Sequence, residues 1–346
     1  MASYTETYVK VRVPATSANI GPGFDCLGVA LDFFDELEVW CSTEDSSTST
    51  AIEVIGQAAP ENENNLIYRV LCEELEHLVA QHFISSGVHI KKIKCHNFIP
   101  HARGLGSSSV ALVGAILAAK VTVLALKTGS FKFSTAQLNS IVENTAKRGV
   151  QIEGHADNVE PCCYGGLTFT AEGAWWMIGE SPESARLHVR DDLRLAVLIP
   201  DTKLATTSAR QVIPKILPSD EREKNKENLV NLLKLLSASG GKRSENEMDA
   251  LIEATDDYIH QDRRSSLYKT SVDLMNELRK SGIPAVISGA GPTVLALWTL
   301  KYDEMAHRIL DDVNTVVDSR NTWEIKYIRP SNCGVQIVSS SIQSQG

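Results

Sequence analysis

Apolar positions along the chain recur with two different periods, which predicts a mixture of strands and helices. Residues 8–13 (YVKVRV) and 88–95 (VHIKKIKC) alternate polar and apolar side chains, as half-buried strands do. We expect the first of these strands to stop at Pro14. From Asn64 onwards apolar residues return every three or four positions, which predicts an amphipathic helix whose start is capped by Asn64 or Asn65.

A turn rich in glycine and serine, HARGLGSSS, follows Pro100 and opens into a nearly all-apolar stretch. A helix without a polar face has to be buried, so we expect this one in the core of the protein. Further helices are predicted over residues 135–147 and 271–280. An amphipathic stretch, ENLVNLLKLLSASGG, predicts a helix that stops at Gly240 and Gly241.

Strand and helix patterns begin again at residues 194–199, which favours a second domain. The chain near its end, IPAVISGAGPTVLALW, joins a glycine-rich turn directly to a strand. No internal repeat and no low-complexity tail is found in the sequence. We therefore predict a two-domain α+β chain that divides somewhere near residues 170–195.

Composition narrows the class of protein. The 346 residues are 43% hydrophobic and 22% charged, which excludes a disordered or fibrous chain, and the net charge of −9 disfavours nucleic-acid binding. No apolar run is expected to reach the roughly 18–20 residues of a membrane helix, and the first residues resemble neither a signal nor a transit peptide, so we expect a cytoplasmic protein. Seven scattered cysteines without a Cys-x-x-Cys pair suggest neither a disulfide framework nor a zinc site.

Three glycine-rich loops, at residues 17–25, 100–109 and 288–293, are the strongest chemical signal. The second lies at the mouth of the apolar helix, where glycines, free backbone N–H groups and hydroxyls make an anion cradle. It is not a Walker A loop, because Gly-x-x-x-x-Gly-Lys-Ser/Thr does not occur. A glycine-rich turn with a serine N-cap would explain one such loop, but three loops at strand or helix ends favour a functional site.

The three loops, in this order, resemble the signature motifs of the GHMP small-molecule kinases, and most specifically those of the homoserine kinase family. Four segments carry the resemblance: PATSANIGPGFDCLG near the start, EGHADNV in the middle, the Thr206-x-x-Ala209-Arg210 element, and His260-Gln261 followed by Arg264. The likeness runs from Val9 to beyond Thr293, which makes chance a poor explanation.

The resemblance implies an ATP- and Mg²⁺-dependent transfer of phosphate to the side-chain hydroxyl of L-homoserine, a step toward threonine. It also implies a two-domain GHMP kinase fold: an N-terminal ATP-binding domain over residues 1–175, with a left-handed β-α-β unit and the phosphate loop, and a ferredoxin-like C-terminal domain over residues 176–346. A homodimer is expected from the same resemblance. Another small-alcohol kinase of this superfamily, such as a mevalonate kinase, and a non-catalytic nucleotide sensor are the alternatives.

An amino-acid substrate needs a cation for its carboxylate and an anion or carbonyl for its ammonium. The resemblance gives the carboxylate to Arg210 and Arg264, with Arg263 as an alternative because HQDRRSSLY departs from the family pattern. Asp25 and Asn158 are the implied catalytic pair, which orients the hydroxyl; a catalytic base stays open, since phosphoryl transfer depends mainly on positioning and charge neutralisation. The full set of implied substrate contacts is Asn19, Asp25, His155, Asn158, Arg210, Arg264 and Gly289.

Magnesium prefers hard oxygen ligands, and the resemblance gives it Ser108 and Glu153, with Glu143 as an alternative acid on the preceding helix. Each of these residues by itself is equally consistent with an ordinary helix face or cap. The implied ATP contacts are Asn65, Pro100, Arg103, Gly104, Leu105, Gly106, Ser107, Ser108 and Ser109.

Overall fold

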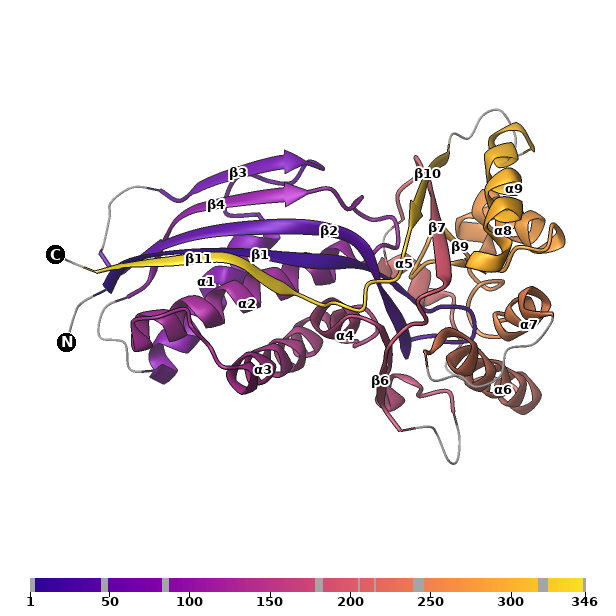
Figure 1. Ribbon diagram of the computed structural model, residues 1–346, viewed down its shortest axis with the longest axis horizontal. Helices are drawn as coiled ribbons and strands as arrows, with labels where there is room; N and C mark the ends of the chain where they lie inside the picture. Colours follow the sequence, from indigo (N-terminus) through magenta and orange to yellow (C-terminus); the bar gives the residue numbers. More distant parts are fainter. Residues whose placement is uncertain are drawn as a thin grey trace.

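The computed structural model describes residues 4–44, 49–82, 87–177, 183–204, 206–214, 216–238, 246–316 and 323–344. Two sheets organise them, a long one with helices packed on one face and a shorter one covered by the helices of the second half of the chain (Figure 1). This α+β arrangement confirms the predicted fold class.

The long N-terminal sheet has the strand order β11-β1-β2-β4-β3, with β5 pairing β2 and β6 pairing β5. Only β3 and β4 run parallel; the other pairs are antiparallel. Its elements are β1 (Tyr4–Ala18), β2 (Leu27–Ser42), β3 (Ala51–Gly56), α1 (Leu66–His82), β4 (His89–Asn97), α2 (Ser107–Thr128), α3 (Thr135–Glu153), α4 (Val159–Tyr164), β5 (Leu167–Phe169), the short 3₁₀ turn η1 (Ala171–Gly173), β6 (Ala185–Leu187) and β11 (Gln336–Ser344).

The C-terminal sheet is antiparallel throughout, in the order β10-β7-β9-β8. Its elements are β7 (Leu193–Pro200), α5 (Thr206–Gln211), α6 (Ser219–Leu236), α7 (Glu247–Ala254), η2 (Ser265–Leu267), α8 (Lys269–Lys280), β8 (Ala285–Ile287), β9 (Val294–Thr299), η3 (Leu300–Tyr302), α9 (Asp303–Val316) and β10 (Trp323–Ile328). Both β6 and β11 follow residue 176 yet belong to the long sheet, so the division into residues 1–175 and 176–346 stays a prediction.

Helix α2 is the central helix of the N-terminal domain. It packs against α1, α3 and β1, and 78% of its most apolar window is buried. The expectation that no apolar run approaches the length of a membrane helix is wrong, because this helix has 22 residues and its most apolar 18-residue window has a mean hydropathy of 2.2. Its apolar composition is explained by burial on nearly all sides, as the missing polar face predicted.

Several predicted elements are found with shifted ends. Strand β1 continues through Pro14, with a register shift before Thr16, because its pairing with β11 ends at Arg12 and no N–H is needed on that side. Helix α1 is capped by Asn65, whose side-chain oxygen accepts the backbone N–H of Ile67 at 2.9 Å. Helix α6 ends at Leu236, and its predicted stop at Gly240 and Gly241 lies outside the described residues.

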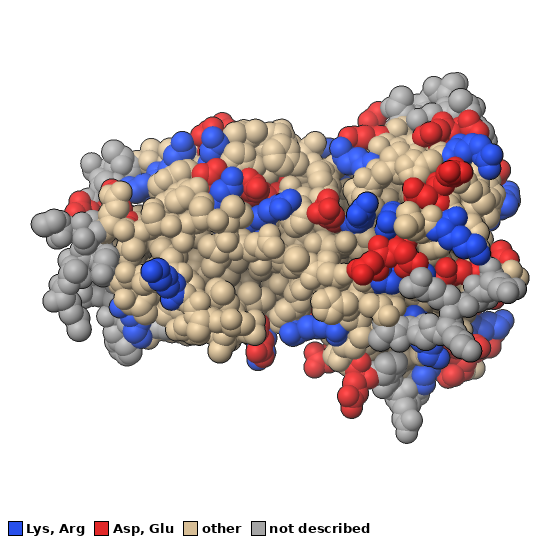
Figure 2. Space-filling model, in the orientation of Figure 1, with Lys and Arg blue, Asp and Glu red and all other residues tan. Residues whose placement is uncertain are grey.

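Charged side chains are distributed unevenly between the two halves of the molecule. On the face shown in Figure 2, Lys, Arg, Asp and Glu gather over the C-terminal domain, whereas much of the N-terminal domain is uncharged. The two signs are mixed over the C-terminal domain, so the surface charge on this face does not single out a binding site.

Candidate active site

The loop before α2 forms a cradle at the helix N-terminus. Gly106 occupies the N-cap with a left-handed backbone (φ 70°) and no side chain caps the helix, so the alternative of a serine N-cap is wrong. A Cβ atom on Gly106 would lie 2.0 Å from the Thr16 hydroxyl, and one on Gly104 would lie 2.1 Å from the Ser288 carbonyl. Glycine is therefore required at both positions, because neighbouring loops lie against the backbone.

Direct hydrogen bonds join the three glycine-rich loops and the middle segment. The Thr16 hydroxyl donates to the side-chain oxygen of Asn158 at 2.7 Å. The Ser288 hydroxyl donates to the Gly104 carbonyl at 2.6 Å and lies 2.8 Å from the Ser17 hydroxyl. Segments far apart in sequence thus meet at the start of α2, as expected if they build one site.

A cavity of about 230 Å³, here called the charged cavity, opens at this meeting point. Most of the predicted site residues line it: Asn19, Gly104, Gly106, Ser107, Ser108, Ser109, Glu153, His155, Asn158, Arg210, Arg264 and Gly289. Both domains contribute to this lining. The cavity therefore exists only where the two domains meet.

Asp25 does not line the charged cavity, but two hydrogen bonds join it to Arg210, which does. Arg210 Nη1 donates to Asp25 Oδ2 at 3.0 Å, and Nη2 donates to Oδ1 at 2.8 Å. The backbone N–H of Asp25 donates to Asn19 Oδ1 at 2.8 Å, which fixes the loop around the carboxylate. The Asp25 carboxylate and the Arg210 guanidinium thus lie in direct contact.

Arg264 and Arg263 occupy different environments, although they are adjacent in sequence. Arg264 is 1% exposed and donates to the backbone carbonyls of Ala209, at 2.8 Å, and Gly289, at 3.3 Å. None of the carboxylates described lies within ion-pair distance of it, and burial lowers its pKa. Arg263 instead pairs with Glu221 at 2.6 Å and does not line the charged cavity. Of the two alternatives, the geometry favours Arg264.

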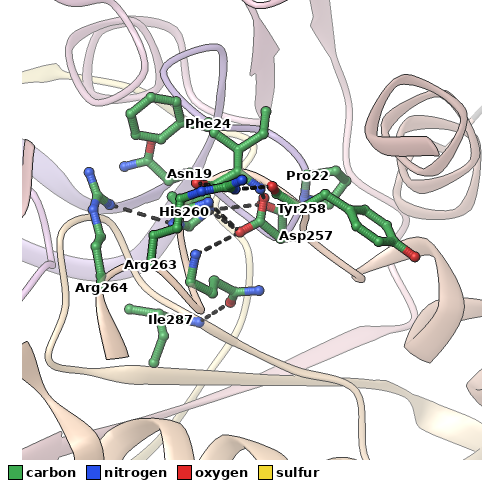
Figure 3. Close-up of polar contacts among 12 residues, drawn as sticks. Asn19, Pro22, Phe24, Asp257, Tyr258, His260, Arg263, Arg264 and Ile287 are labelled. Atoms are coloured by element: carbon green, nitrogen blue, oxygen red, sulfur yellow. Dashed lines mark hydrogen bonds and ion pairs between the residues drawn. The ribbon is translucent and has the colours of Figure 1, made fainter. Parts of the chain in front are cut away.

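The loop from Asp257 to Arg264 connects the C-terminal domain to the glycine-rich loops (Figure 3). The Asp257 carboxylate accepts three backbone N–H groups, including those of His260 and Gln261. His260 Nε2 lies 2.9 Å from the Gly21 carbonyl, and burial lowers the pKa of His260, so the neutral imidazole donates this hydrogen bond. Gln261 Oε1 accepts the N–H of Ile287. The loop thereby fixes the position of Arg264.

Glu153 is the last residue of α3 and faces the start of α2. Its carboxylate accepts hydrogen bonds from the Ser108 hydroxyl at 3.3 Å and the Ser109 hydroxyl at 3.2 Å. Glu143, the alternative acid, is exposed and pairs with Lys147 at 2.9 Å, away from the cavity. Of Glu153 and Glu143, only Glu153 lies close enough to these serines to bind the same metal ion.

His155 is held beside Asn158 by a buried acid. Its Nδ1 lies 2.7 Å from Asp157 Oδ1, and Asp157 is 1% exposed. Burial alone would lower the pKa of His155, but the hydrogen bond and charge of Asp157 outweigh it and raise that pKa. His155 therefore presents its Nε2 side to the charged cavity in a fixed orientation.

A second cavity of about 280 Å³, here called the apolar cavity, lies on the other side of Ser107 and Ser108. Its walls come from β2, the segment before α1, and α2, and they include Asn65, Ala111 and the buried carboxyl of Asp35. Of the predicted nucleotide contacts, Asn65, Ser107 and Ser108 lie here.

Three of the predicted nucleotide contacts line neither cavity. Leu105 is 1% exposed and packs in the core, and Pro100 is also buried. Arg103 donates from Nε to the Pro200 carbonyl at 2.7 Å and from Nη2 to the Asp201 carbonyl at 2.6 Å. The Arg103 side chain therefore holds the end of strand β7 of the C-terminal domain.

Comparisons with known proteins identify relatives over most of the chain. The family model described as GHMP kinases N terminal domain matches residues 65–166. The homoserine kinase of Streptomyces avermitilis is 36% identical over 292 residues, covering 84% of this chain and 85% of that protein. The homoserine kinase of Rhodococcus erythropolis is 34% identical over 294 residues, covering 84% and 86%. The chain belongs to the homoserine kinase family.

Two solved structures share the fold of this chain. A homoserine kinase from Cytophaga hutchinsonii superposes with a TM-score of 0.72 at 24% identity, covering 96% of this chain and 97% of that one. A mevalonate kinase from Staphylococcus aureus gives a TM-score of 0.52 at 15% identity, covering 92% and 98%. The similarity therefore extends over both domains.

Sequence reasoning missed several residues of this candidate site. Thr16 lies in β1, directly before the first loop, and its position beside the turn formers was the available signal. Asp35 and Ala111 lie in an apolar strand and an apolar helix, whose patterns mark burial only. Trp175 reaches the Asp25 carboxylate from the segment after η1, where no periodicity pointed to a site.

Proposed function

We propose that this protein is a homoserine kinase, which transfers the terminal phosphate of ATP to the hydroxyl of L-homoserine to give O-phospho-L-homoserine, in threonine biosynthesis. One observation carries the proposal. A charged cavity lined by two arginines, one of them paired with Asp25, meets an apolar cavity at the serines of an anion cradle. A zwitterion and a nucleotide can thus bind on opposite sides of one phosphate site.

The apolar cavity suits the base and sugar of ATP, and the start of α2 suits its phosphates. Free backbone N–H groups at a helix N-terminus bind anions, and Gly106 leaves them uncovered. The hydroxyls of Ser107 and Ser108 lie where the two cavities join. The phosphate to be transferred is therefore placed next to the acceptor.

The charged cavity suits the two charges of an amino acid. Arg210 and Arg264 bind the carboxylate, and Asp25 binds the ammonium. Asn158, fixed by Thr16, and Asn19 then orient the hydroxyl toward the phosphate. Phosphoryl transfer is catalysed mainly by such positioning and by charge neutralisation, so these contacts account for catalysis without a dedicated base.

Mg²⁺ fits the oxygen donors of Ser108 and Glu153, which lie 3.3 Å apart at the mouth of the cradle. Among the described residues no group of three His, Cys, Asp or Glu side chains forms a metal cluster, so the site suits a metal that takes phosphate and water as further ligands. When bound, the ion would neutralise charge on the phosphates.

We also propose a cytoplasmic homodimer that binds neither membranes nor nucleic acids.

A coupled ADP-release assay with purified protein and Mg²⁺ tests the proposal, using L-homoserine, D-homoserine, L-serine, mevalonate and no acceptor. We expect turnover selective for L-homoserine. Arg210→Ala should raise KM for L-homoserine about 100-fold and leave KM for ATP unchanged, because the carboxylate loses a charged partner.

Arg194→Ala is the matched control, because among the described residues Arg194 donates only to the nearby carbonyls of Asp191 and Leu193 and lines neither cavity. Turnover with mevalonate alone would be consistent with the fold but would contradict L-homoserine as the substrate. ATP binding without turnover on any acceptor would favour a nucleotide sensor.

A further inference from the structure

Two adjacent tryptophans follow η1 and have opposite environments. Trp176 is 2% exposed, and its Nε1 donates to the Phe24 carbonyl at 2.9 Å. The same segment is held one turn earlier by the N–H of Thr170, which donates to the Cys26 carbonyl at 2.9 Å. Trp175 is 45% exposed. Trp176 and Thr170 thus hold the segment against the first loop, and Trp175 projects from an anchored backbone.

Trp175 is directed to Asp25, the carboxylate that pairs with Arg210 of the charged cavity. Its Nε1 donates to Asp25 Oδ2 at 3.4 Å. Its ring meets the Phe24 ring edge to face, with centroids 6.3 Å apart and an interplanar angle of 80°. A large ring that stays exposed, with its polar end on a site carboxylate, is typical of a residue that recognises a ligand.

The two oxygens of the Asp25 carboxylate have different sets of hydrogen-bond donors. Arg210 donates to both Oδ1 and Oδ2, whereas Trp175 donates only to Oδ2. The Arg210 side chain is 39% exposed and lies on the short helix α5. If Arg210 turns to a substrate carboxylate, Oδ1 becomes free for an ammonium while Trp175 still holds Oδ2.

We propose that Trp175 is a specificity-determining residue of the acceptor site. Its indole N–H keeps the Asp25 carboxylate oriented for an ammonium, and its ring occupies the space beside that carboxylate. The acceptors selected in this way are small 2-amino acids whose ammonium carries no substituent. The inference rests on the proposed function and adds to it a residue that limits which acceptors bind.

Two substitutions separate the roles of the N–H and the ring. Trp175→Phe removes the hydrogen bond and should raise KM for L-homoserine about fivefold, with kcat within about twofold and KM for ATP unchanged. Trp175→Ala also opens the space, so kcat/KM for N-methyl-L-homoserine relative to L-homoserine should rise about tenfold or more. Trp40→Phe is the control, since Trp40 packs against Tyr8 on β1 and lines neither cavity.

Steady-state kinetics with both acceptors, together with thermal unfolding of each variant, decide the outcome. An unchanged KM in Trp175→Phe with an unchanged acceptor ratio in Trp175→Ala would overturn the role of Trp175. An equal loss of kcat with both acceptors would also overturn it, because that result indicates a structural role. Failure of the wild-type protein to phosphorylate L-homoserine would instead overturn the proposed function.

Discussion

The apolar cavity and the charged cavity share Ser107 and Ser108 but are assembled differently. Every residue that lines the apolar cavity lies between Val13 and Gly114, within the N-terminal domain. The charged cavity takes its lining from Asn19 to Ala290, across both domains. The nucleotide side is thus built by local packing, whereas the acceptor side depends on how the two domains meet. Substitutions should therefore affect nucleotide and acceptor separately, except at the shared serines and at Glu153, the partner of Ser108.

The largest effect is expected where the two cavities join. Glu153→Gln removes the negatively charged oxygen that accepts a hydrogen bond from Ser108 and that would bind the proposed metal. We therefore expect kcat to fall about 100- to 1,000-fold and the Mg²⁺ concentration needed for half-maximal activity to rise. Glu143→Gln, ten residues earlier on α3, is the matched control and should behave as wild type. Mg²⁺ titrations of kcat measure both. Equal losses in the two variants would contradict the assignment.

A smaller and one-sided effect is expected in the apolar cavity. Ala111→Phe places a ring in this cavity from α2, so KM for ATP should rise about tenfold while KM for L-homoserine is unchanged. This is the mirror image of the Arg210→Ala result. Ala111→Ser, which keeps the volume, serves as control. If both KM values rise together, the two cavities are not independent.

The smallest effect concerns stability. Burial raises the pKa of Asp35 to about 6, although the N–H groups of Ile99 and Phe98 oppose the shift by donating to Oδ1. An unfolded Asp titrates near pH 4, so between about pH 4 and 6 the folded protein holds a proton that the unfolded chain has lost. The free energy of unfolding therefore decreases as pH rises through this window.

Asp35→Asn keeps the accepting oxygen and removes the charge. It should raise the free energy of unfolding at pH 7.5 by about 1–3 kcal/mol and should abolish this part of the pH dependence. Urea unfolding at pH 4.5 and 7.5 measures it, with Asp32→Asn as the control for an exposed carboxylate on the same strand. A variant that retains the wild-type slope would show that folding does not raise the pKa of Asp35.

The sequence predicted the elements well where one face alone is buried. The alternation around Val9 and the periodicity after Asn64 correspond to β1 and α1, because a strand or helix with one buried face has a readable pattern. The expectation that no apolar run approaches the length of a membrane helix was wrong, because α2 has that length and apolarity, while its predicted burial is observed. The return of β11 to the first sheet could not be predicted, since pairing partners are chosen by tertiary contacts.

Residues of the candidate site that lie in contiguous motifs were predicted. Single residues that reach the site from other segments of the chain were not. Asn158 and Gly104 lie in recognisable segments, and the structure brings both to the charged cavity. Arg103 also lies in such a segment, but its guanidinium bonds to backbone carbonyls of the other domain. Neither this redirection nor the approach of Trp175 to Asp25 has a local sequence signal.

The pairing of β11 with β1 has a consequence for how the chain folds during synthesis. Until residues 336–344 leave the ribosome, β1 is an edge strand with unpaired backbone groups along YVKVRV. The nascent N-terminal half is then exposed to aggregation through that edge for most of translation. A protein expressed as residues 1–175 alone would keep this liability permanently, so the first half of the chain reaches its protected state only when the last strand arrives.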